Sequence, residues 1–201
     1  DCVDLYKEKF DPIFAGGENA CILHYNENNK LLNDGDLLLI DAGCEVLGYA
    51  SDITRTFPVN GKFSVPQKEI YEIVLNAQIQ AIASIMPGED VSKPHEIACE
   101  IITRGLMKLG IMDDISNLKE FYMHGTGHWL GLDVHDVGVK EIDNSFRKFE
   151  VGMVTTVEPG IYIRKDDKID PKYWNIGIRI EDDVLVTIDG NHVLSEVAIK
   201  N

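Results

Sequence analysis

The spacing of glycines and acidic residues repeats once along the chain, and this repeat constrains the fold more than any other feature. In residues 35–43 and again in residues 152–160, a glycine opens a short apolar stretch, an acid follows six positions later, and a second glycine comes two positions after that. Residues 52–61 and 181–190 each begin with an acid and reach a turn glycine nine positions on. Unless this is chance similarity among common turn residues, the chain consists of two related halves with acids at the ends or starts of adjacent strands.

Apolar periodicity and turn signals predict the elements that carry this repeat. Ser64 and Gln67 have the spacing of a capping box, and Pro87-Gly88 ends the helix that follows. A second helix is expected from about Ser92 to Gly110. The expected core-facing residues are Ile70, Val74, Ala77, Ala81 and Ile85 in the first helix, and Ile97, Ile101, Leu106 and Leu109 in the second. Strands are predicted at residues 36–41, 53–59, 153–157 and 176–188, which together indicate a single α+β domain.

The four acids of the repeat are Asp41, Asp52, Glu158 and Glu181. Asp41 and Glu158 end very apolar strands, where an unpaired ionised carboxylate costs several kcal/mol or more. If all four converge, they cannot all stay ionised without compensating positive charge, and two divalent ions would supply it. The alternative is that some of them are turn caps or surface acids.

A histidine-rich stretch at residues 124–136 contains His124, His128 and His135 among several glycines. Gly125 and Gly127 argue against a regular helix, and no glutamate follows His124 as a zincin motif requires. We expect a loop that presents imidazoles beside a pocket, where one ligates metal and others donate hydrogen bonds or relay protons. Each histidine taken alone is more often structural or exposed.

Composition excludes several classes of protein. The 201 residues carry 19 basic and 34 acidic side chains, a net charge of −15, which disfavours nucleic acid and anionic membrane surfaces as partners. Apolar runs stay far short of the ~20 residues of a membrane span. The cysteines (Cys2, Cys21, Cys44 and Cys99) include no CxxC pair, which favours a reducing, cytoplasmic setting over a disulfide scaffold. Because the first residue is Asp1, we expect a fragment of a longer protein.

Five motifs in order resemble the pita-bread metallopeptidases: residues 41–43, 49–56, 124–136, 157–160 and 177–182. Residues 16–25 and the His-Trp-Leu-Gly-Leu-Asp-Val-His-Asp stretch are similar to the aminopeptidase P subgroup in particular. The resemblance implies a pita-bread fold with a pseudo-twofold repeat around a dinuclear metal site. It runs from about Phe14 to the C-terminus.

The resemblance also implies a role for each matching residue. Asp41 would chelate one metal, Asp52 and Glu181 would bridge both, and His128 would bind the second metal with Glu158. Glu158 would also accept the proton of the bridging water. The remaining matches are His24 and His135 facing the substrate, His124 beside them, and Tyr162 and Arg179 near the metal carboxylates. A mostly carboxylate shell suits Mn²⁺ best, with Co²⁺, Fe²⁺ or Zn²⁺ as alternatives.

The activity implied is release of the N-terminal residue from peptides with proline second, by a hydroxide held between the two ions. Prolidase, which cleaves Xaa-Pro dipeptides, is the main rival. Methionine aminopeptidase and metal-free creatinase fit less well, and a non-catalytic pita-bread interaction module is the alternative outside enzymes. Residues 1–201 are then expected to be a catalytic domain that lacks its first helix and a preceding domain, weakly active alone and homo-oligomeric at full length.

Overall fold

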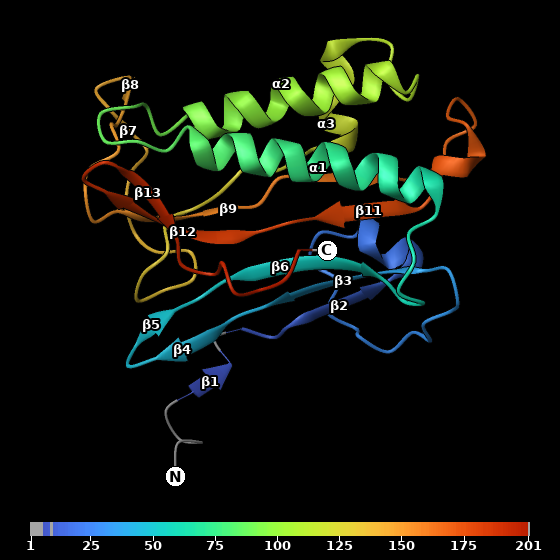
Figure 1. The fold of residues 1–201 in the computed structure, drawn as a ribbon, viewed down its shortest axis with the longest axis horizontal. Helices are drawn as coiled ribbons and strands as arrows, with labels where there is room; N and C mark the ends of the chain where they lie inside the picture. The colour runs from blue at the N-terminus through green and yellow to red at the C-terminus, as the bar shows by residue number, and fades with distance from the viewer. Residues whose placement is uncertain (1–5, 9, 201) are drawn as a thin grey trace.

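The computed structural model describes residues 6–8 and 10–200. Two long helices lie side by side over one face of a set of small antiparallel sheets (Figure 1). The helices are α1 (Val65–Ala83), α2 (Lys93–Lys108) and α3 (Leu118–Phe121), with 3-10 turns η2 (Gly17–Cys21), η3 (Ile115–Asn117) and η4 (Pro171–Tyr173). The strands are β1 (Tyr6–Glu8), β2 (Ile13–Gly16), β3 (Leu37–Ala42), β4 (Cys44–Val46), β5 (Tyr49–Ala50), β6 (Ile53–Pro58), β7 (Glu141–Ile142), β8 (Ser145–Phe146), β9 (Val154–Val157), β10 (Gly160–Ile163), β11 (Ile176–Arg179), β12 (Asp182–Thr187) and β13 (Gly190–Val193).

The sequence repeat corresponds to two equivalent strand pairs. Strand β3 pairs with β6 in the sheet β2-β3-β6, and β9 pairs with β12 in the sheet β13-β12-β9, both antiparallel. Their registers differ by two residues, because Asp41 faces Thr54 whereas Val157 faces Asp182. Side chains alternate between the two faces of a sheet. A register difference of two residues therefore leaves each acid on the same face of its sheet as the matching acid of the other half.

The main core lies between the two long helices and strands β9 to β12, and a smaller cluster lies between β2, η2 and β3. The capping box is confirmed, since Ser64 Oγ accepts from the Gln67 amide and Gln67 Oε1 accepts from the Ser64 amide. Helix α1 ends at Ala83, earlier than the apolar stripe predicted. Ile85 is fully buried just beyond the end of the helix. The helix does not continue through Met86, because Pro87 disfavours helical backbone in the residue before it.

The predicted stripe of α2 was only partly right. Ala98, Ile102 and Leu106 are fully buried, whereas Ile97, Ile101 and Leu109 are half-buried at the side of the contact. Gly105 explains why the buried face of α2 is displaced from the predicted one. A Cβ at this position would lie 2.8 Å from the Ile73 side chain of α1, so Gly105 faces α1 closely. The close approach of α1 therefore fixes which face of α2 is buried. No helix in residues 6–8 and 10–200 combines the length and apolar character needed to cross a membrane.

The predicted single strand at residues 176–188 was wrong. It forms two strands in different sheets, β11 paired with β10 and β12 paired with β9. At the break, the Ile180 amide donates to the Pro159 carbonyl and the Glu181 amide donates to the Thr54 carbonyl. Glu181 therefore lies at the junction between the two halves of the molecule.

Candidate metal centre

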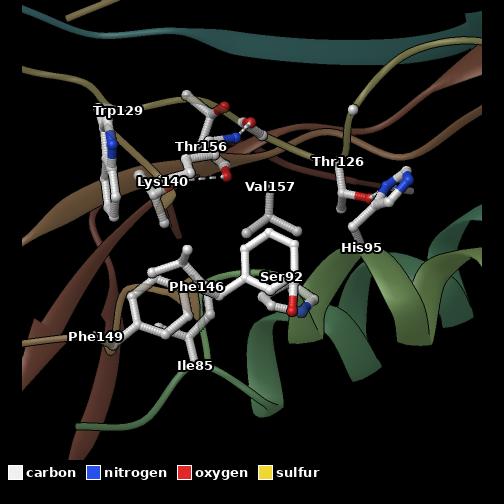
Figure 2. A pocket seen from close by; sticks show the side chains of 15 residues that line it. Ile85, Ser92, His95, Thr126, Trp129, Lys140, Phe146, Phe149, Thr156 and Val157 are labelled. Atoms are coloured by element: carbon white, nitrogen blue, oxygen red, sulfur yellow. Dashed lines mark hydrogen bonds between the residues drawn. The ribbon is translucent and has the colours of Figure 1, made fainter. Parts of the chain in front are cut away.

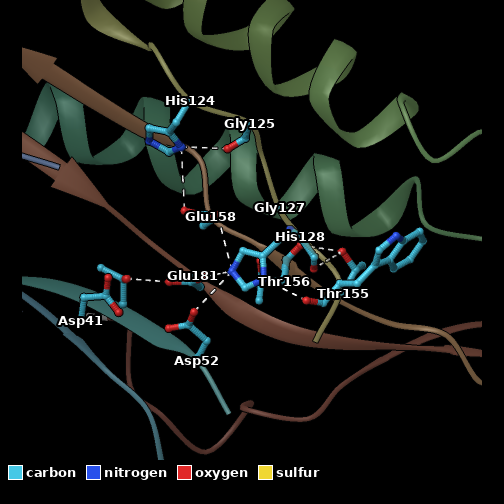
Figure 3. A network of polar contacts seen from close by, with 12 residues as sticks. Asp41, Asp52, His124, Gly125, Gly127, His128, Thr155, Thr156, Glu158 and Glu181 are labelled. Carbon is cyan, nitrogen blue, oxygen red and sulfur yellow. Dashed lines mark hydrogen bonds and ion pairs between the residues drawn. The ribbon is translucent and has the colours of Figure 1, made fainter. Parts of the chain in front are cut away.

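The side chains expected at the site surround one cavity of about 320 Å³. The expected residues that line it are His24, Asp41, Asp52, His124, His128, His135, Glu158, Arg179 and Glu181. Figure 3 shows the four acids with His124 and His128. Tyr162 is fully buried behind this wall and reaches it through its hydroxyl group. The cavity thus brings together residues from both halves of the chain.

Each acid reaches the cavity from a strand end. Asp41 lies near the end of β3 and Asp52 immediately precedes β6. In the second half, Glu158 directly follows β9 and Glu181 directly precedes β12. This agrees with the placement that the sequence repeat predicted.

The arrangement of donor atoms fits a cation. Ligand atoms of Asp52, His128 and Glu181 all lie within 4.8 Å of one another. His128 Nε2 is 3.4 Å from Asp52 Oδ2, 3.9 Å from Glu158 Oε1 and 4.0 Å from Glu181 Oε1. Asp41 Oδ1, Asp52 Oδ1 and Glu181 Oε1 are buried with no hydrogen-bond partner among the described residues. Since buried carboxylate oxygens need a proton, a donor or a metal, this set is suited to divalent ions.

Burial and the charges of the neighbouring acids raise the pKa values of Asp41, Glu158 and Glu181. Burial raises the pKa of Glu181 well above its usual range, and the charges of Glu158, Asp52 and Asp41 raise it further. Burial likewise raises the pKa of Glu158 to about 7 and that of Asp41 to about 6, although Arg179 opposes both shifts. Near neutral pH the cluster therefore retains protons that a cation would displace.

A buried chain of polar groups connects Asp41 to His124. Arg179 Nη2 donates to Asp41 Oδ2 at 2.6 Å, and Arg179 Nη1 donates to the Tyr162 hydroxyl at 3.1 Å. That hydroxyl is 2.8 Å from His124 Nε2, and His124 Nδ1 is 2.8 Å from the Gly125 carbonyl. Because a carbonyl only accepts, His124 carries its proton on Nδ1 and accepts from Tyr162 at Nε2. Burial lowers the pKa of His124 to about 4, which keeps this imidazole neutral.

His128 is oriented toward the acids by its backbone contact. Its Nδ1 lies 3.0 Å from the Trp129 carbonyl, so Nδ1 donates and Nε2 faces the carboxylates. The His135 ring packs edge-on against the His128 ring at 4.2 Å. The side chains of His24 and His135 are exposed on the cavity wall.

The histidine-bearing segment runs alongside β9, and Gly127 allows this approach. The Thr156 amide donates to the His128 carbonyl, and the Glu158 amide donates to the Thr126 carbonyl. A Cβ at Gly127 would lie 2.0 Å from the Thr156 carbonyl oxygen. The glycine is therefore required for His128 to lie beside the acids.

A second cavity of about 200 Å³ lies behind this segment, between the first turn of α2 and the hairpin β7-β8 (Figure 2). Its walls are mostly apolar and include Trp129, Phe146 and Phe149. Lys140 Nζ donates to the Gly127 carbonyl at 2.6 Å, and His95 Nδ1 lies 2.8 Å from Thr126 Oγ1. These contacts support the histidine segment from the side opposite the acids.

Two residues of the site were missed by sequence reasoning. Thr54 Oγ1 donates to Glu181 Oε2 at 2.6 Å and accepts from Arg179 Nε at 3.2 Å. Asp183 Oδ2 accepts the Asp52 amide at 3.2 Å, and Asp183 is itself buried. Strand alternation was the available signal, because each lies two positions after a site acid and so shares its face.

Two equivalent halves, each contributing an antiparallel sheet and two acids to one cavity that histidines also line, define a pita-bread metallopeptidase. The sequence profile of metallopeptidase family M24 matches residues 4–188, and the chain belongs to this family. It is 55% identical over 198 residues to the Xaa-Pro aminopeptidase of Haemophilus influenzae and 50% identical over 198 residues to that of Escherichia coli, covering 95% of this chain in each case. Its structure matches Pseudomonas aeruginosa aminopeptidase PepP with a TM-score of 0.93 and 51% identity, over 96% of this chain.

The chain spans less than half the length of these relatives, 46% and 45% of the two aminopeptidases and 46% of the PepP chain. A zinc-substituted Escherichia coli aminopeptidase P in complex with product matches with a TM-score of 0.91 and 49% identity, over 96% of this chain and 46% of its own. The expected family and fold are thereby confirmed.

Proposed function

We propose that this chain is the catalytic part of a metal-dependent aminopeptidase that releases the N-terminal residue from peptides with proline second. The observation that carries the proposal is the convergence of Asp41, Asp52, His128, Glu158 and Glu181 on one cavity, with buried oxygens that lack partners within the described chain. The printed names of the relatives, Xaa-Pro aminopeptidases at 50–55% identity, support the substrate class.

The same five side chains are the proposed ligands of two divalent ions. Asp52 and Glu181 would bridge the pair, Asp41 would complete one side, and His128 with Glu158 the other; the short distances from His128 to Asp52 and Glu158 support this assignment. When bound, such ions supply Lewis acidity and lower the pKa of a shared water molecule. We propose Mn²⁺ as the preferred ion, because carboxylate oxygens dominate the donor set.

Glu158 is the proposed proton carrier. Its carboxylate faces the cavity, within reach of a group that reacts there. It would take a proton from the attacking water and pass it to the departing proline nitrogen. That nitrogen carries no hydrogen in the peptide, so it must be protonated to leave.

The histidines are the proposed substrate contacts. His24 and His135 lie exposed on the cavity wall, where they can donate hydrogen bonds to the peptide or to the developing oxyanion. His124 is held as a neutral imidazole by Tyr162 and by burial. Tyr162 is linked through Arg179 to Asp41, so these hydrogen bonds would fix the position of His124 relative to the proposed metal ligands.

Three further features complete the proposal. Residues 1–201 form the catalytic domain, and the full-length protein is a homo-oligomer of a reducing compartment such as the cytoplasm. The free thiols of Cys21, Cys44 and Cys99 support the reducing setting. Cys2 lies outside the described residues.

The test is hydrolysis by the purified chain with and without added Mn²⁺, using a tripeptide with proline second, the same tripeptide with alanine second, and an Xaa-Pro dipeptide. Asp52→Asn serves as the inactive control. We expect metal-dependent release of the first residue from the proline tripeptide alone. Preference for the dipeptide would replace the proposal with prolidase activity, and equal cleavage of the alanine peptide would refute the proline specificity.

A further inference from the structure

Next to the site, the fully buried carboxylate of Asp182 accepts from four side-chain donors. Adjacent residues of an extended chain point to opposite faces, so Asp182 points away from the cavity that Glu181 lines. Its Oδ1 accepts from Arg55 Nη2 and Ser195 Oγ, each at 2.7 Å. Its Oδ2 accepts from Gln78 Nε2 at 2.6 Å and Lys200 Nζ at 2.5 Å. Four donors on one buried carboxylate fix its position closely.

Arg55 uses its guanidinium group to join three segments of the chain. Nη1 donates to the backbone carbonyls of Thr54 and Glu181, which belong to different halves of the molecule. Nη2 donates to Asp182 and to the Ala198 carbonyl at 2.9 Å. Nε donates to the Ile199 carbonyl at 3.1 Å. The side chain is almost entirely buried, so these bonds are shielded from water.

The position of Arg55 between the two halves matters because the proposed bridging ligands come from strands of different sheets. Asp52 immediately precedes β6, Glu181 immediately precedes β12, and these strands belong to the sheets β2-β3-β6 and β13-β12-β9. The distance between the two carboxylates therefore depends on individual contacts across the junction. Arg55 makes such a contact directly. It lies three residues after Asp52 in the chain and donates a hydrogen bond to the backbone carbonyl of Glu181.

We propose that Arg55 and Asp182 are positioning residues that hold Asp52 and Glu181 at the separation needed for two ions, and that residues 195–200 complete this brace. The inference rests on the proposed metal centre of the preceding section. The Tyr71 hydroxyl of α1 also donates to the Lys200 carbonyl, so the brace links helix α1, both halves and residues 195–200. It touches neither substrate nor ion and acts only through the ligands.

The test compares Mn²⁺ affinity with the stability of the metal-free protein. Arg55→Lys keeps the charge but cannot reach all the partners of the guanidinium fork. Ser195→Ala combined with Lys200→Met removes two donors and leaves the Arg55–Asp182 pair intact. Ile102→Val and Leu106→Ala, in the buried face of α2, are the matched controls, because they lower stability without touching the brace. Calorimetric titration with Mn²⁺ is run well below each variant's unfolding temperature.

We expect Arg55→Lys to weaken Mn²⁺ binding at least tenfold and the double variant at least threefold, whereas the α2 controls bind as wild type. If Arg55→Lys fails to fold, the double variant decides. Wild-type affinity in the double variant, or equal losses in the controls, would overturn the proposal, as would absence of Mn²⁺ binding by the unaltered chain. A further outcome separates the two proposals. If the variants lose Mn²⁺ affinity as expected but the unaltered chain does not cleave proline peptides, the proposed activity is refuted and the brace is supported.

Discussion

Substitution of Gly127 by alanine tests whether the histidine segment must lie against β9 for the site to form. The added Cβ would lie 2.0 Å from the Thr156 carbonyl oxygen, whereas ordinary contact begins near 3.4 Å. The segment must therefore move away from β9. This stretches the hydrogen bonds from the Thr156 amide to His128 and from the Glu158 amide to Thr126. His128 then leaves its position 3.4 Å from Asp52.

The expected cost combines two contributions. Overpacking costs ~1–3 kcal/mol, and each weakened hydrogen bond costs about 1 kcal/mol. A total of roughly 3–5 kcal/mol lowers the unfolding temperature of a chain of this size by about 6–20 °C. Because His128 is a proposed ligand, Mn²⁺ affinity should fall at least tenfold as well.

Gly125→Ala is the matched control, since the nearest atom to a Cβ there is the Gly127 carbonyl oxygen at 3.9 Å. Thermal unfolding followed by circular dichroism and calorimetric Mn²⁺ titration measure both effects. We expect Gly125→Ala to behave as wild type. Wild-type stability and metal affinity in Gly127→Ala, or equal losses in both variants, would refute the reasoning.

Three further predictions concern the acids and the first helix. Glu158→Gln should lower turnover of a proline tripeptide at least ~100-fold with an unchanged circular dichroism spectrum, and wild-type turnover would rule out its role as proton carrier. Mn²⁺ binding should release protons and strengthen from pH 6 to pH 8, because burial raises the pKa of Glu158 to about 7 and a cation competes with the protons held below that value. Titration heats that are identical in buffers of different ionisation enthalpy would contradict this. Ser64→Ala should lower the free energy of unfolding by ~1 kcal/mol through loss of the α1 capping box, measured by urea denaturation, and an unchanged midpoint would argue against it.

The parts of the fold that the sequence predicted well are those set by local signals. The repeat, the capping box of α1 and the strand-end positions of the four acids depend on turn residues and short apolar runs within a few positions of one another. The break at Ile180 and Glu181 was missed because no glycine or proline marks it between Gly177 and Gly190. Only the tertiary bonds to Pro159 and Thr54 separate β11 from β12.

The sequence identified residues that line the cavity where their types suggest chemistry, and it missed the ordinary side chains that support them. Histidines and strand-end acids indicate a metal site, and the family resemblance assigned a role to each of them. Thr54 contacts Glu181 across 127 positions of sequence, and Arg55 contacts Asp182 across the same separation. Strand alternation places Thr54 on the face of Asp52, but no local pattern shows which residue of the other half such a threonine or arginine contacts. These partners therefore emerged only from the folded structure.

The most direct measurement of the central claim is anomalous diffraction from crystals of this chain grown with Mn²⁺. We predict two manganese peaks in the cavity, with carboxylate oxygens of Asp52 and Glu181 bound to both ions and His128 bound to one. Absence of manganese from the cavity, or ions held by other side chains, would contradict it.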